Sequence, residues 1–272
     1  MPGSSPILGT AALSMPWPTL DPFLFSVYHD DQYPAGNANM GPAESLRGHR
    51  IGSDFGNQAG WNMYHGEIVP GFPRHPHRGF ETVTLTRHGV IDHADSLGAA
   101  GRFGFGDVQW MTAGRGVQHS EMFPLLDQQS GNRLELFQIW LNLPADDKMA
   151  EPCYKMLWAE DLPSATPAPG VHVVTVAGAL EGASGPLPAP PPASYAARAE
   201  SDVAIWTLRL DAGAKWTLPP ARSGAAAKRM LYFFKGADAN VAGTVVPRPR
   251  AIELRADAPV EVSRRRPPGA PS

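Results

Sequence analysis

The sequence of 272 residues has one cysteine, Cys153, and no long hydrophobic run. A single cysteine excludes an intrachain disulfide and fits a reducing compartment. No apolar stretch approaches the roughly 18–20 residues of a membrane-spanning helix. Residues 1–18 contain no lysine or arginine, so the basic start of a secretory signal is missing. We therefore expect a soluble, cytoplasmic protein with no membrane partner.

The chain also has little net charge. The formal charge is -3 at pH 7, which gives no basic surface for nucleic acid. Hydrophobic residues make up 43% and charged residues 18%, the composition of a globular protein with a real core. Twenty-nine prolines and 28 glycines favour short strands and turns over long helices.

Short apolar runs separated by glycines predict many strands, an arrangement typical of sandwiches and barrels. A proline- and alanine-rich connection at residues 162–170 separates two groups of strands. We expect residues 1–18 to form a loose tail and residues 264–272 to be disordered. The predicted strands are 23–28, 67–69, 82–86, 90–93, 108–111 and 134–141, then 171–176, 204–210, 230–234 and 251–254.

Two motifs, HPH and HSE, each place two metal-capable side chains two residues apart: His75 with His77, and His119 with Glu121. Side chains at i and i+2 of a β-strand point to the same face. If the two strands lie side by side, all four side chains converge on one point. Three imidazoles and one carboxylate would suit a divalent first-row metal.

The remaining candidates are weaker. The proline between His75 and His77 cannot donate to a ladder, so it predicts an edge strand or the start of one. Glu81 follows His77 by four residues and would lie on the same face if the strand were continuous. It could then act as a metal ligand, as a proton acceptor or as a structural carboxylate, and we favour the structural role. Five other histidines before His119 are unpaired, and we expect them to be packing or surface residues: His29, His49, His65, His88 and His93. After His119 only His172 remains, which excludes a histidine-based metal site in the second half.

At these motifs the chain resembles the pirin family, within the cupin superfamily. The resemblance is strong over about residues 19–160 and weak beyond. It is carried by LDPF (20–23), HPHRGFETV (75–83), GDVQWMTAGRG (106–116), HSE (119–121), LNL (141–143) and KMAEP (148–152).

The resemblance implies an all-β fold of two cupin-type β-sandwich barrels, a bicupin, with few short helices. We expect a metal-binding domain at residues 19–160 and a metal-free cupin-like domain at 171–262. Pirins usually continue beyond the point that corresponds to Ser272, so we expect the second barrel to be truncated.

The family's metal ligands fall on His75, His77, His119 and Glu121. The resemblance implies iron(II) as the first choice, although this ligand set alone would also accept Mn, Ni, Co, Cu or Zn. Four protein ligands leave two positions open on a six-coordinate metal.

Two functions remain open at this point. Pirin-like proteins are linked to quercetin 2,3-dioxygenase activity, which implies an oxidoreductase that acts on flavonols with O2, with Glu121 as catalytic base. The alternative is an iron-binding regulatory protein that binds transcription factors or metabolic enzymes without turnover. A cavity over the metal that fits a tricyclic ligand would favour the enzyme, and a flat charged surface would favour the regulator.

Overall fold

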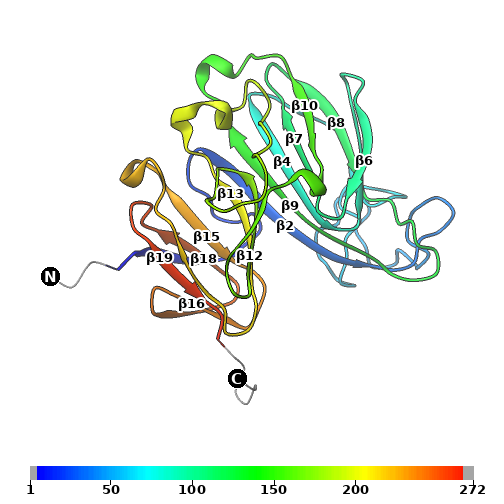
Figure 1. Cartoon of the computed structure of the whole chain (residues 1–272). Helices are drawn as coiled ribbons and strands as arrows, with labels where there is room; N and C mark the ends of the chain where they lie inside the picture. Colours follow the sequence, from blue (N-terminus) through cyan, green and yellow to red (C-terminus); the bar gives the residue numbers. More distant parts are fainter. Residues whose placement is uncertain (1–4, 266–272) are drawn as a thin grey trace. The chain divides into compact units, whose positions relative to one another are not determined.

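The computed structural model describes residues 5–265, and this part of the chain is built from short strands (Figure 1). It contains 19 strands and five helical turns of three residues each. This confirms the predicted all-β fold with few short helices. Among the described helices, none has the length and apolar character needed to span a membrane. Most of the tail predicted to be disordered, residues 266–272, lies outside the described part.

The chain divides into two compact units. The N-terminal unit comprises Ser26–Glu160 and Pro191–Ser194. The C-terminal unit comprises the described parts of Met1–Phe25, Asp161–Pro190 and Tyr195–Ser272. As domain limits, residues 19–160 and 171–262 stay a prediction.

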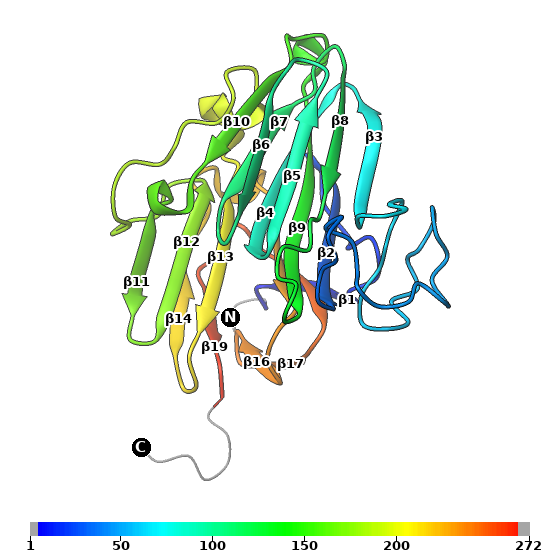
Figure 2. The ribbon, with the colours of Figure 1, turned by 90° about the vertical axis from the view of Figure 1, so that its right-hand side faces the viewer.

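The N-terminal unit is a sandwich of two antiparallel sheets, which lie face to face in Figure 2. One sheet has the strand order β10-β7-β4-β9-β2 and the other β3-β8-β5-β6. Their bounds are β2 (Phe23–Tyr33), β3 (Gly71–His77), β4 (Phe80–His88), β5 (Val90–Asp95), β6 (Ala100–Gly104), β7 (Val108–Thr112), β8 (Val117–Met122), β9 (Asn132–Asn142) and β10 (Cys153–Leu157); the turns η1 (Ala145–Asp147) and η2 (Ala159–Asp161) flank β10.

The C-terminal unit holds three smaller sheets, of strand order β1-β18-β15, β11-β12-β13 and β14-β19-β16-β17. Valine and leucine side chains from several of these strands, with Ile252, form its apolar core. The bounds are β1 (Ile7–Ala12), β11 (Ser164–Ala168), β12 (Val171–Ala177), η3 (Tyr195–Ala197), η4 (Ala199–Ser201), β13 (Ile205–Leu210), β14 (Lys215–Leu218), η5 (Gly224–Ala226), β15 (Arg229–Phe233), β16 (Asp238–Val241), β17 (Thr244–Pro247), β18 (Arg250–Leu254) and β19 (Val260–Ser263).

Two local predictions are wrong. The predicted N-terminal tail contains β1, which pairs antiparallel with β18, and Trp17 is buried beside Tyr232 with ring centroids 5.1 Å apart. This pairing joins residues more than 200 positions apart, so no local pattern announces it. Residues 67–69 form no strand, because the Gly66 N–H donates to the Met63 carbonyl in a turn and leaves Ile68 exposed.

Strand β3 lies at the edge of its sheet, which confirms the position expected from Pro76. Its first residue, Gly71, has φ of +128°, in the region that L side chains rarely adopt. A Cβ atom there would lie 2.5 Å from the Glu121 carbonyl oxygen and 2.8 Å from the Met122 Cα. Only glycine lets β3 approach β8 this closely.

We expect Gly71→Ala to destabilise the protein more than Gly98→Ala. Gly98 also has positive φ, +90°, but a Cβ atom there would meet nothing within 4 Å. The control should therefore lose only about 1–2 kcal/mol from backbone conformation, whereas Gly71→Ala should lose about 1–3 kcal/mol more from the clash with β8. Urea unfolding of the two variants measures the difference, and equal losses would show that β3 and β8 are not in close contact at Gly71.

Candidate metal centre

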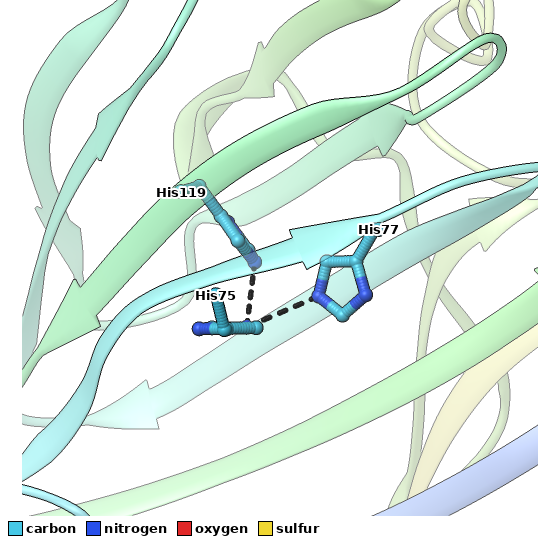
Figure 3. Close-up of side chains that lie close together, drawn as sticks. All are labelled: His75, His77 and His119. Carbon is cyan, nitrogen blue, oxygen red and sulfur yellow. Dashed lines mark hydrogen bonds between the residues drawn. The ribbon is translucent and has the colours of Figure 1, made fainter.

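Three histidine side chains from two adjacent strands converge in the N-terminal unit (Figure 3). Strand β3 pairs antiparallel with β8, and His75 stands directly opposite His119. The Nε2 atom of His75 lies 3.1 Å from Nε2 of His77 and 3.0 Å from Nε2 of His119. The strands that carry the two motifs therefore lie side by side, as convergence of the four side chains requires.

These distances fit a shared metal ion. Two nitrogen ligands bound cis, each at about 2.1 Å from one ion, lie about 3.0 Å apart. The same two contacts are hydrogen bonds between imidazoles, in which one ring donates an N–H and the other accepts it. A bound metal would replace these hydrogen bonds and take the lone pair of each Nε2 atom. All three ligand atoms lie within 4.8 Å of one another, so the residues present fit a metal.

Burial keeps the two inner histidines in the form that binds metals. His77 and His119 are buried, and His75 is half-buried. Burial, followed by the neighbouring rings of His119 and His75, lowers the pKa of His77 to about 3. Burial, followed by His75 and His93, lowers the pKa of His119 to about 3. Both rings are therefore neutral near pH 7 and offer a nitrogen lone pair.

Glu121 lies beside this cluster of three histidines. Its Oε2 atom is 3.8 Å from Nε2 of His119. The carboxylate is buried and accepts hydrogen bonds from Thr84 Oγ1 at 3.2 Å and from Gln138 Nε2 at 2.7 Å. The structure thus brings three of the four predicted ligands into direct proximity and places the fourth next to them.

Glu81 does not face the histidines, as the structural reading of this residue predicts. His77 ends β3 and Glu81 belongs to β4, so the two do not share one strand. Its buried carboxylate accepts hydrogen bonds from Trp110 Nε1 at 3.1 Å, Thr112 Oγ1 at 2.8 Å and Ser194 Oγ at 2.9 Å. It ties the segment 191–194 to the N-terminal unit.

A third pair with the same spacing borders the site. His93 and Asp95 also stand at i and i+2, on β5, and lie opposite Glu121 and His119 respectively. His93 Nε2 is 3.0 Å from Asp95 Oδ2, both side chains are fully buried, and the His93 ring centroid is 5.3 Å from that of His119. The sequence could have revealed this pair, because His93 and Asp95 have the same i, i+2 spacing as the two recognised motifs.

Residues 14–141 match the family model described as Pirin. Pirin-1 of Arabidopsis thaliana is 48% identical over 120 residues, which are 44% of this chain and 39% of that protein. Pirin of Homo sapiens is 38% identical over 150 residues, 55% of this chain and 46% of that protein. A Pseudomonas aeruginosa protein named "Putative quercetin 2,3-dioxygenase PA2418" is 41% identical over 144 residues, which are 53% of this chain and 47% of that protein. The chain therefore spans less than half the length of these curated relatives.

Two solved structures share the fold over most of the chain. A crystal structure of quercetin 2,3-dioxygenase from Acinetobacter baumannii has a TM-score of 0.69 and 24% identity, and the match covers 97% of this chain and 84% of that one. The structure of GK1651 from Geobacillus kaustophilus has a TM-score of 0.59 and 25% identity, and the match covers 90% of this chain and 79% of that one. With the family match, this similarity confirms the predicted two-cupin fold.

We expect the metal-free protein to lose stability as the pH falls from about 6.5 toward about 3, in part through His77. The folded pKa of His77 lies below its unfolded value, so the unfolded state binds more protons in this window. His77→Asn removes this contribution, and its unfolding free energy should depend less steeply on pH. Urea unfolding in chelator between about pH 7 and about pH 5 tests this; parallel slopes for the two proteins would contradict it.

Proposed function

The chain belongs to the pirin family of cupin proteins through residues 14–141, and we propose that it is a metal-dependent, quercetin 2,3-dioxygenase-type oxidoreductase that acts on flavonols with O2. One divalent ion binds His75, His77, His119 and Glu121. The observation that carries this proposal is the convergence of the three Nε2 atoms beside a buried carboxylate.

Iron(II) is the proposed metal, since the family implies it. The donor set of three imidazoles and one carboxylate also accepts Mn, Ni, Co, Cu or Zn. When bound, the metal supplies Lewis acidity that favours the ionised form of a flavonol hydroxyl.

The chain's own residues provide the proton acceptor and an apolar surface. Glu121 takes the proton of the flavonol 3-hydroxyl, which leaves the flavonolate that reacts with O2. Trp140 and Phe80 are half-buried, and their ring centroids are 4.6 Å apart. The ring centroid of Trp140 is 5.4 Å from that of His77. In this proposal an aromatic substrate packs against these two rings, which lie beside the cluster.

The named Pseudomonas aeruginosa relative supports this substrate class, although this chain spans under half of it. A regulatory protein would also hold the metal but would bind a protein partner without turnover. Turnover of a flavonol by the metal-loaded protein separates the two functions.

We expect His77→Ala to lose most bound metal while it remains folded. His77 supplies one of the three converging nitrogens and lies at the end of an edge strand. Metal analysis after loading with iron(II) under anaerobic conditions measures the loss. His88→Ala is the matched control, because the His88 side chain is half exposed and outside the cluster. Stoichiometric metal in a His75→Ala/His77→Ala/His119→Ala protein would exclude this site.

We expect Glu121→Gln to keep appreciable metal and to lose flavonol oxidation by about 10²-fold or more, the usual effect of removing a general base. Glutamine keeps an oxygen donor and the size of the side chain but removes its basicity. Metal content and flavonol-dependent oxygen uptake are measured on the same preparation. Full activity at full metal occupancy would reject Glu121 as the base. Absence of turnover in the unmutated, metal-loaded protein would favour the regulatory function.

A further inference from the structure

The side-chain amide of Gln138 has only one orientation available to it. The indole N–H of Trp140 can only donate, and it donates to Gln138 Oε1 at 3.1 Å. The Nε2 atom of Gln138 must then face Oε2 of Glu121, 2.7 Å away. Flipping the amide would lose both hydrogen bonds, so this assignment follows from the chemistry of the indole.

The donors around Glu121 are neutral. Thr84 donates to Oε1 and Gln138 to Oε2, so each carboxylate oxygen is held by one hydrogen bond. In the part of the chain that the structure describes, no lysine or arginine side chain pairs with Glu121. The carboxylate keeps its negative charge for a cation at the histidine cluster, while its rotation is restricted.

The sheet register brings these groups together. Thr84 on β4 stands directly opposite Gln138 on β9, and both face Glu121 on β8 of the other sheet. Trp140, two residues after Gln138, lies on the same face and contacts the ring of His77 at a centroid distance of 5.4 Å. One continuous chain of contacts therefore joins His77, through Trp140 and Gln138, to Glu121.

We propose that Gln138 is a positioning residue for the metal centre: locked by Trp140, it fixes the Glu121 carboxylate so that one oxygen is presented to the ion in a defined way. This inference rests on the proposed metal site. Without Gln138 the carboxylate gains rotational freedom, and it binds the metal more weakly and in a different manner. Groups that hold metal ligands in this way typically contribute 10–100-fold to metal affinity.

The test uses cobalt(II) as the probe, because its visible spectrum reports the number and arrangement of its ligands. We expect Gln138→Met, which preserves the side-chain volume, to weaken cobalt(II) binding about 10–100-fold and to change the visible spectrum of the bound ion. Trp140→Phe keeps a ring beside His77 but removes the N–H that locks the amide. It should shift affinity and spectrum in the same direction by a smaller amount.

Trp110→Phe is the matched control. It removes the indole N–H of another tryptophan in the same sheet. That N–H also donates a hydrogen bond of 3.1 Å, but its acceptor is Glu81, which faces away from the histidines. A loss of stability without a change in the cobalt(II) spectrum is expected there. An unchanged spectrum and affinity in folded Gln138→Met would overturn the inference, as would equal spectral changes in Trp110→Phe and Trp140→Phe. If His77→Ala also retained cobalt(II), the metal site itself would fail, and the two failures are thereby distinguished.

Discussion

The antiparallel register between β3 and β8 is the constraint on which the candidate site depends. It places His75 opposite His119 and brings the three Nε2 atoms together. A slip by one residue would turn the side chains of one strand to the other face and separate the histidines. The register shift between Phe72 and His75 and the close approach at Gly71 fix the position of β3 along β8. Local backbone geometry thus determines the chemistry of the site.

The opposing sheet supplies the polar surroundings that this geometry needs. Along β4, Glu81 points away from the site, whereas Thr84 points toward Glu121, as the alternation of a strand requires. The carboxylate of Glu81 and that of Glu121, which comes from the other sheet, are therefore buried against opposite faces of the sheet that contains β4. Glu81 is satisfied by three neutral donors and has a structural role. Glu121 has two such donors and lies beside neutral histidines, so a bound cation would offset the cost of its buried charge.

The sequence predicted the ligand residues better than it predicted their surroundings. The spacing of His75 with His77 and of His119 with Glu121 is a local pattern, and strand alternation converts it into a shared face. Glu81 could not be assigned by spacing alone, because the chain turns at Gly79, φ +76°, and starts a new strand. Gln138 lies within an apolar run, and only the pairing of β9 with β4 shows that it faces Glu121. The strand β1 depends on a pairing with β18 that no local window contains.

The proposed roles of Glu121 make opposing demands on one side chain. A metal ligand must be held in place, whereas a base must have a lone pair free to accept a proton. Hydrogen bonds from Thr84 and Gln138 restrict the carboxylate without neutralising it, and each engages only one lone pair of its oxygen. A lysine or arginine in the same position would hold the group equally well but would lower both its basicity and its attraction for a cation. Neutral donors are therefore the arrangement that permits both roles.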